Sequence, residues 1–276
     1  MKILNLIENV EGTEGCKAAH GLSFYIETER HKLLLDLGPS ADTITNAEIL
    51  GVKLDSIDTV VLSHGHYDHS GGILPFTKIN DHAAIYMQKA AVGNYYADEG
   101  PNAEERYRYI GIDPKIPELP QVKMISGNYV IDDELSLYTI PKRSHPVPFA
   151  NRSILVKQGD AFVHDNFEHE QYLVVSEGGK NVLLSGCAHN GMLSILDEYE
   201  RLYGADPDIA ISGFHLMKKT EYKEEQVREI RETAEALKKR KTRFITCHCT
   251  GLPAFEIMKE IMGDQLEYVR SGEPIL

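Results

Sequence analysis

Three imidazoles and one carboxylate occur within six residues, in the segment His64-Gly-His66-Tyr-Asp68-His69. Imidazole and carboxylate groups are the usual ligands of zinc and of non-haem iron and manganese in proteins. Four such groups in so short a loop cannot all reach one ion. We expect His64 and His66 to face one way and Asp68 and His69 the other, which indicates two neighbouring metals. Chance can explain one isolated histidine in a polar loop, but it is a poor explanation for four ligand-type residues at this spacing.

The residues before this loop predict a buried strand. Thr59–Leu62 is a β-branched, apolar run that leads directly into the histidines. Gly65 is expected to let His64 and His66 diverge from a tight turn, and Gly71-Gly72 to release the backbone after it.

Three further histidines follow apolar, strand-like runs later in the chain. They are His189 in Gly-Cys-Ala-His-Asn-Gly, His215 in Gly-Phe-His-Leu and His248 in His-Cys-Thr-Gly. Loops held at one edge of a rigid scaffold are where binding and catalytic residues are expected. The sequence therefore predicts that these loops meet the first one.

The spacing His-x-His-x-Asp-His after a hydrophobic strand resembles the signature of the metallo-β-lactamase superfamily. The three later motifs narrow the resemblance to a subfamily of dihydropterin ribofuranosyl-aminobenzene phosphate synthases and related metal-dependent hydrolases. The resemblance spans nearly the whole chain. It implies an α/β fold of the αββα type, a sandwich of two mixed sheets flanked by helices, formed by residues 1–276 as one domain.

The same resemblance implies a ligand set for two divalent transition metals, with zinc as the first expectation and iron or manganese as alternatives. The first metal would take His64, His66 and His189, and the second would take Asp68, His69 and His248. It also implies that Asp36, in an Asp-x-Gly turn, supports the metal loop.

One position departs from the family pattern. Family members usually have a bridging Asp after the mid-chain strand, where this chain has Cys187. Either the Cys187 thiolate replaces that ligand, or Cys187 is a small buried residue and the second metal is held more weakly. Asp165 is another candidate for the missing carboxylate. His164 and His169 are expected at the surface, His31 in a turn, and His20 is equally compatible with a functional and a structural role.

The expected chemistry is hydrolysis by a metal-activated water, because a bound divalent ion lowers the pKa of water to about 7. Asp68 would orient the nucleophile while binding the second metal, and His215, which is not needed as a ligand, would contact substrate or transfer a proton. The substrate would be a small phosphorylated or ester-like metabolite. A synthase that joins an aryl or pterin ring to a phosphoribosyl donor is the alternative, and the residues do not decide between the two. A non-catalytic sensor is disfavoured by the complete motif, and a di-iron redox module by the lack of a flavin-binding segment.

Composition narrows the class of partner. The chain has 42 acidic and 29 basic residues and a formal charge of −13. This balance disfavours nucleic acid and anionic membranes as partners, but it leaves room for a local basic pocket that binds one small anion. The N-terminus makes a poor signal peptide. Four sparse cysteines disfavour a disulfide scaffold, so we expect a reducing cytoplasm.

The remaining sequence patterns predict the strands and helices that hold these loops. We expect strands at 2–10, 22–28 and 32–36, a helical connector at 46–54, a hairpin at 172–185, and helices at 192–203, at 220–241 and from Pro253. Val227, Ile230, Ala234 and Leu237 form the predicted buried stripe of the helix at 220–241. The segment at about 75–148 is predicted to be an insertion near the mouth of the site. Its candidate cations, alternatively solvated surface charges, are Arg106, Arg108, Lys142, Arg143 and His145.

Overall fold

A computed structural model describes residues 1–276, and it contains two large sheets that face each other. The first sheet has the strand order β1-β2-β3-β4-β5-β8. Its strands are β1 (Lys2–Ile7), β2 (Ser23–Glu27), β3 (Lys32–Leu35), β4 (Thr59–Val61), β5 (Ala84–Gln88) and β8 (Val122–Ile125). The pairs β1–β2 and β2–β3 are antiparallel, whereas β3, β4, β5 and β8 run parallel.

The second sheet has the order β17-β16-β15-β14-β13-β10-β9. Its strands are β9 (Tyr129–Val130), β10 (Leu135–Tyr138), β13 (Tyr172–Glu177), β14 (Lys180–Leu184), β15 (Ile209–Ser212), β16 (Arg243–Thr246) and β17 (Leu266–Tyr268). Strands β14 to β17 are parallel. The carboxyl ends of parallel strands share one edge of a sheet, where ligand sites are usually built.

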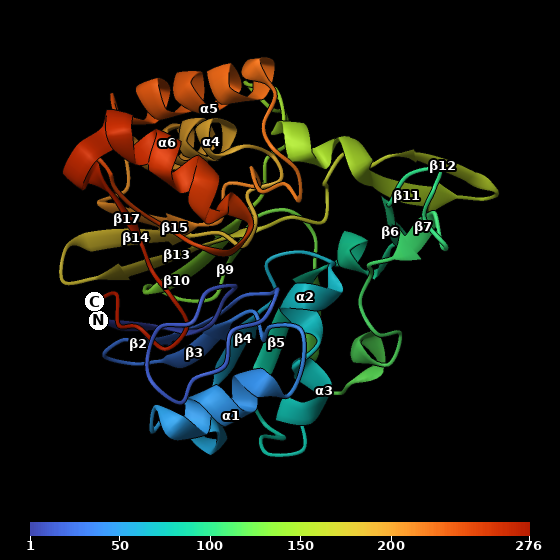
Figure 1. Cartoon of the computed structure of the whole chain (residues 1–276). Coiled ribbons are helices and arrows are strands. Elements are labelled where there is room, and N and C mark those ends of the chain that lie inside the picture. Colours follow the sequence, from blue (N-terminus) through green and yellow to red (C-terminus); the bar gives the residue numbers. More distant parts are fainter.

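Helices cover the outer face of each sheet (Figure 1), so the expected αββα sandwich is confirmed. Below the first sheet in that view lie α1 (Asp42–Ile49) and α3 (Ile73–Phe76), and the short helix α2 (Tyr67–Ser70) contains Asp68 and His69. Above the second sheet lie α4 (Met192–Tyr203), α5 (Glu224–Leu237) and α6 (Leu252–Met262). One apolar cluster contains buried side chains of both sheets, among them Phe24, Leu35, Leu173 and Ile211.

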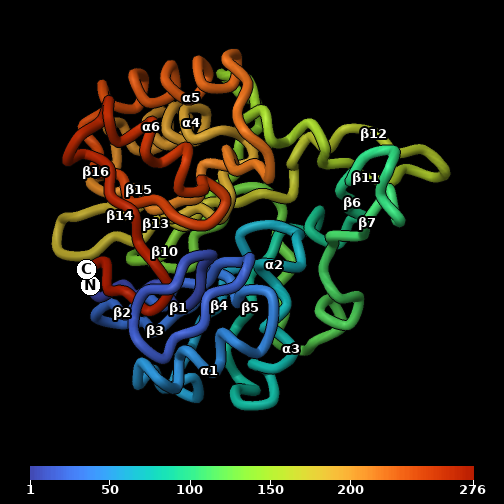
Figure 2. Tube along the Cα trace, in the orientation of Figure 1, coloured from blue at the N-terminus to red at the C-terminus, as the bar shows by residue number.

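A third, four-stranded sheet projects from the side of the sandwich in both ribbon views (Figures 1 and 2). Its order is β12-β11-β6-β7, with β6 (Tyr95–Asp98), β7 (Tyr107–Tyr109), β11 (Ile154–Gln158) and β12 (Ala161–His164). The predicted insertion at about 75–148 is therefore distributed differently: β5 and β8 are strands of the first sheet, β9 and β10 belong to the second, and only β6 and β7 stand apart. The projecting sheet is completed by residues after 148.

Helix α5 begins at Glu224, four residues later than the pattern predicts. The Lys223 backbone amide donates to Gln226 Oε1 at 3.0 Å, which defines the first turn. Ile230, Ala234 and Leu237 are fully buried as predicted, whereas Gln226 takes the place expected for Val227. No helix combines the length and the apolar character that crossing a membrane requires.

Candidate metal centre

Four loops that follow parallel strands meet at the edge of the two large sheets where those strands end. They come after β4, β14, β15 and β16, and they bring His64, His66, Asp68, His69, Cys187, His189, His215 and His248 together. The backbone takes the left-handed conformation at Asp36, Ala188, His215 and His248 (φ of 49° to 60°). Such conformations are costly for residues with a side chain and concentrate at functional sites. The predicted convergence of these loops is what the structure shows.

The residues expected around the first metal lie close together. Ligand atoms of His64, His66 and His189 are all within 4.8 Å of one another, and all three residues are buried. The Nε2 atoms of His64 and His189 are 3.3 Å apart. Gly65 is needed here for a different reason from the predicted turn: a Cβ at Gly65 would lie 2.5 Å from the carbonyl oxygen of Ala91, so the chains are too close for any side chain.

The residues expected around the second metal surround the Asp68 carboxylate. Asp68 Oδ2 lies 3.6 Å from His69 Nε2 and 3.5 Å from His248 Nε2. His20 Nε2 is also 3.5 Å from the same oxygen, although the His20 side chain is half exposed. His20 therefore lies at the rim of the centre, which the sequence alone could not decide.

Each of four histidine rings is fixed through its Nδ1 atom. His69 Nδ1 bonds Asp36 Oδ2 at 2.6 Å, and the contacts of His64 with Ser63, of His189 with Asn151 and of His248 with Asn9 are each 2.8 Å. Asp36 also accepts from the Ser63 amide and hydroxyl, both at 2.7 Å. These contacts leave the Nε2 atoms free to bind a metal, which is how metal-binding histidines are usually oriented.

Two buried carboxylates hold the backbone of the later loops. Glu170 accepts from the backbone amides of His189 and Asn190, at 2.6 and 2.9 Å. Glu8 accepts from the backbone amide of His248 at 2.9 Å. Neither glutamate belongs to a recognisable motif, so the sequence alone indicates neither of them, nor Asn9 and Asn151.

Unpartnered buried atoms show that the donor set fits a metal. His66 Nε2 and His248 Nε2 have no hydrogen-bond partner, although both side chains are buried. Leaving a buried polar atom without a partner costs about 1–3 kcal/mol. A divalent cation bound by these nitrogens would remove that cost.

The protonation states agree with this fit. Burial, with repulsion from the other rings, holds the pKa of His64 and His189 well below the usual range, and burial lowers the pKa of His66 to about 3. Burial would also lower the pKa of His69, but the Asp36 and Asp68 carboxylates raise it to about 9. Neutral imidazoles are the ligand form, and at His69 a metal would compete with a proton.

The two candidates for the missing carboxylate occupy different places. Cys187 Sγ is 3.2 Å from His69 Nε2 and within 4.8 Å of ligand atoms of His64 and His189. Asp165 instead bonds His169 Nε2 at 2.9 Å, and His169 Nδ1 accepts from the Gly65 amide at 3.0 Å. Cys187 thus lies between the two predicted metal positions, and Asp165 supports the metal loop through His169.

The expectation that His169 lies at the surface is wrong. Its side chain is 1% exposed, because it packs between Tyr95 and the metal loop. His164 is exposed as expected. His31 lies in the predicted turn, but its ring also bonds Asp58 and Asp132.

His215 lies beside the centre. Its ring is 4.1 Å from that of His189, centroid to centroid, and its Nδ1 atom is buried without a hydrogen-bond partner. A nitrogen of His215 is also within 4.8 Å of Cys187 Sγ. This geometry suits proton transfer and also permits a ligand role, so the assignment of His215 to catalysis stays a prediction.

An open cleft of about 480 Å³ gives access to the centre. Its cationic lining residues are Arg108, Arg152, Lys218 and Lys219. Arg108 and Lys219 are both paired with Glu99, whereas the Arg152 side chain makes no hydrogen bond or ion pair. Among the cations predicted from sequence, only Arg108 lines this cleft.

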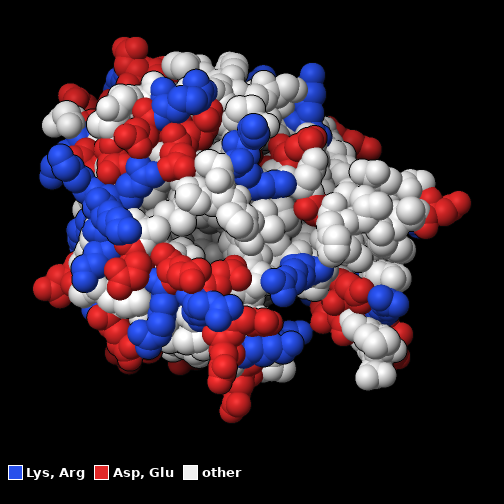
Figure 3. Space-filling model, turned by 90° about the horizontal axis from the view of Figure 1, so that it is seen from above, with Lys and Arg blue, Asp and Glu red and all other residues white.

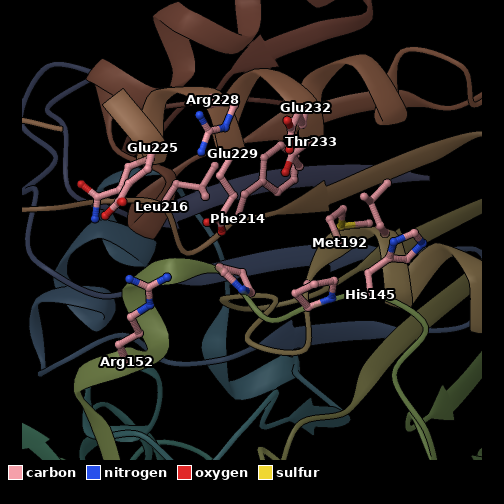
Figure 4. Close-up of a pocket in the computed structure, with 15 residues that line it drawn as sticks. His145, Arg152, Met192, Phe214, Leu216, Glu225, Arg228, Glu229, Glu232 and Thr233 are labelled. Atoms are coloured by element: carbon pink, nitrogen blue, oxygen red, sulfur yellow. The ribbon is translucent and has the colours of Figure 1, made fainter. Parts of the chain in front are cut away.

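A second pocket of about 560 Å³ adjoins the cleft (Figure 4). It lies between α5, the start of α4 and the segment of residues 145–152, and it contains none of the predicted metal ligands. Arg152 and Gln226 line both cavities. Figure 4 shows the Arg152 guanidinium pointing from the segment of residues 145–152 toward α5.

Comparisons with known proteins agree with this geometry. The family model described as "Metallo-beta-lactamase superfamily" matches residues 17–226. A 7,8-dihydropterin-6-methyl-4-(beta-D-ribofuranosyl)-aminobenzene-5'-phosphate synthase of Methanocaldococcus jannaschii is 28% identical over 100% of this chain and 96% of its own length.

Two solved structures extend the comparison. Tm1679, described as a metal-dependent hydrolase of the beta-lactamase superfamily, superimposes with a TM-score of 0.81 and 27% identity over 100% of this chain and 98% of that one. The zinc-bound PqqB of Methylobacterium extorquens, with a TM-score of 0.58 and 13% identity over the full length of both chains, shares the fold.

Proposed function

Because this chain belongs to the metallo-beta-lactamase superfamily, we propose that it is a metal-dependent hydrolase of a small phosphorylated or ester-like metabolite. The observation that carries the proposal is the buried cluster of His64, His66 and His189 beside Asp68, with unpartnered imidazole nitrogens directed into it. The resemblance to Tm1679 over the whole chain supports the same class of reaction.

The residues that would hold the metals are His64, His66 and His189 at the first position, and Asp68, His69 and His248 at the second, with Cys187 between them. Two divalent cations, zinc before iron or manganese, would act as Lewis acids and make water a nucleophile at neutral pH. The imidazole-rich donor set favours zinc or iron.

The chain's own residues have separate tasks. Asp68 would accept a hydrogen bond from the attacking water and align it, while His215 would carry a proton to or from the leaving group at its unpartnered Nδ1 atom. Arg152, whose side chain has neither an ion pair nor a hydrogen bond in the cleft, would bind an anionic group of the substrate.

The expected substrate is a small molecule. Figure 3 shows acidic and basic side chains interspersed on one face of the molecule, without the broad basic surface that nucleic acid requires. We also propose a reducing compartment such as the cytoplasm, since all four cysteines are free.

A synthase remains the second candidate, because the Methanocaldococcus jannaschii relative is similar over the full chain and its name describes a ribofuranosyl-aminobenzene phosphate product. In that reaction the same cleft would bind a phosphoribosyl donor. A phosphorylated substrate of either candidate enzyme would bring its phosphate near Arg152.

Labelled water separates the two. Zinc-loaded protein incubated with a panel of phosphate esters, lactones and thioesters in ¹⁸O-water should yield a product with one label, and Asp68→Asn should lower turnover by orders of magnitude. Turnover only with an aromatic amine and a phosphoribosyl donor, with pyrophosphate released and no label incorporated, would reject hydrolysis in favour of the synthase.

A further inference from the structure

Cys249 lies inside the candidate metal centre, although no predicted ligand set contains it. It follows His248 in the loop after β16 and is 3% exposed. The sulfur atoms of Cys187 and Cys249 and a ring nitrogen of His248 all lie within 4.8 Å of one another. Two thiols and an imidazole at this separation are zinc-type ligands.

The backbone fixes the direction of the Cys249 side chain. The Cys249 carbonyl accepts from the amides of Leu216 and Met217, at 2.9 and 2.8 Å. A Cβ added to Gly213 would lie 2.4 Å from Cys249 Sγ, so the sulfur packs directly on the Gly213 backbone. The same thiol donates to the Cys187 carbonyl oxygen at 3.6 Å, which holds the sulfur beside Cys187.

An independent observation indicates that this cluster is built for a ligand. His248 is fully buried, its Nδ1 is held by Asn9 Oδ1, and its Nε2 has no hydrogen-bond partner. Asp68 Oδ2, 3.5 Å from that nitrogen, is too distant for a good hydrogen bond. A metal bound beside the two sulfur atoms would provide the missing partner.

We propose that Cys249 is a metal ligand, so that the second metal position is held by Cys187, Cys249 and His248 as well as by its carboxylate. On binding, each thiol releases one proton to solvent and contributes a thiolate. This inference rests on the metal centre proposed above but not on the reaction that the centre performs.

Two sulfur ligands determine which metal the position selects. Thiolates bind zinc and other soft ions well, whereas manganese and magnesium prefer carboxylate, carbonyl and water oxygens. We therefore expect the second position to bind zinc in preference to manganese. Replacing both sulfurs by hydroxyls should reduce that preference.

The test is the absorption of the cobalt(II)-loaded protein, because thiolate-to-cobalt charge transfer absorbs in the near ultraviolet and imidazole or carboxylate ligation does not. The wild type should show this band. Cys187→Ser and Cys249→Ser should each weaken it, and the double variant should lose it. Zinc competition against manganese should favour zinc less strongly in the double variant than in the wild type.

Two cysteines outside the centre provide controls. Cys247 is buried next to the same histidine but packs in the apolar cluster between the sheets, and Cys16 packs near Gly272. Cys247→Ala and Cys16→Ser should keep the full band.

In the Cys187→Ser variant, Cys249 is the remaining thiol of the centre, so any sulfur band must come from Cys249. This variant is decisive if Cys249→Ser fails to fold. Cobalt bound by Cys187→Ser without any sulfur band would overturn the assignment of Cys249 while leaving the metal centre intact. A wild-type protein that binds no cobalt would overturn both this inference and the proposed metal centre. Metal with the expected sulfur band but without hydrolysis would reject the proposed reaction alone.

Discussion

Three of the four fixed imidazoles obtain their orientation from residues distant in the sequence, whereas His64 contacts its neighbour Ser63. Asn9 holds the ring of His248 and Asn151 holds the ring of His189, and the asparagines precede these histidines by 239 and 38 residues. Each asparagine accepts at a ring Nδ1 atom and so presents Nε2 to the centre. The asparagines that orient the rings are not themselves metal ligands, so their effect can be tested without removing a ligand.

Removing a ring-orienting asparagine should weaken metal binding without removing a ligand. We expect Asn151→Ala to lower affinity at the first metal position, and Asn9→Ala at the second, by about 10–100-fold each. Titration against a chelator of known affinity measures the change. Asn128→Ala, which loses only the exposed contact with Thr139, is the matched control. Unchanged affinity in both variants would contradict the role assigned to these contacts.

Measuring both metal content and turnover distinguishes a catalytic role of His215 from a metal-binding role. If it transfers a proton, His215→Gln should keep its metal and lower turnover by about 10²–10⁴-fold, the usual contribution of a general acid or base. Elemental analysis and rate measurements on the same sample test this. Loss of metal in the variant would place His215 among the ligands instead, as its distance from Cys187 permits.

At the scale of residues, the sequence indicates the candidate metal ligands better than the residues that hold those ligands in place. His64, His66, Asp68 and His69 could be found because four ligand-type groups share one loop. Asn9, Asn151, Glu8 and Glu170 could not, because an asparagine or a glutamate in a strand or loop has no distinctive pattern until the fold places it against a histidine.

At the scale of elements, the candidate ligands lie in loops that follow strands, and the ends of those strands can be predicted from apolar runs in the sequence. Helix α4 has the predicted bounds, and the hairpin of β13 and β14 lies where its pattern places it. The segment at 75–148 was harder, since its short strands join three different sheets. Pairing between distant segments depends on tertiary packing, which local periodicity does not report.

The turn between β2 and β3 carries a pH-dependent contact. His31 Nδ1 lies 2.8 Å from Asp58 Oδ1, and its Nε2 lies 2.7 Å from Asp132 Oδ2 in the turn before β10. Burial opposes the charged form, but the two carboxylates raise the pKa of His31 above the ordinary value of 6.5. The contact ties the first large sheet to the second.

Because the folded pKa is raised, this contact stabilises the fold fully below the unfolded value of 6.5 and loses its contribution as pH rises through the folded value. The difference in free energy of unfolding between wild type and His31→Gln should therefore be largest below that pH and should shrink above it. Denaturant unfolding at several pH values measures it. His82→Gln, which removes an exposed imidazole outside this contact, is the control.

On the scale of the whole molecule, the two cavities share Arg152, a side chain without an ionic partner. We expect Arg152→Gln to raise KM for an anionic substrate while leaving metal content and kcat nearly unchanged, because Arg152 would bind the substrate and not the reacting atoms. Lys219→Gln is the control, since Lys219 is paired with Glu99 and its side chain is 89% exposed. A fall in kcat with unchanged KM would contradict a binding role.

The candidate metal centre also joins the two large sheets, since loops of the first sheet provide His64 to His69 and loops of the second provide Cys187, His189 and His248. A ligand that binds only the folded chain stabilises it, by about 2.7 kcal/mol at a free concentration of 100 times Kd. Removing the metals with a chelator should therefore lower the unfolding temperature, by roughly 5–10 °C for a chain of this size.

The shift should depend on ligands from both sheets. Because each metal position needs its own ligands, His66→Ala and His248→Ala should each show a smaller difference between metal-loaded and chelated protein. His82→Ala removes an exposed imidazole outside the centre and should keep the full difference. Differential scanning calorimetry with and without chelator gives both values. An unfolding temperature that is the same in loaded and chelated wild type would show that the cluster holds no metal of consequence to the fold.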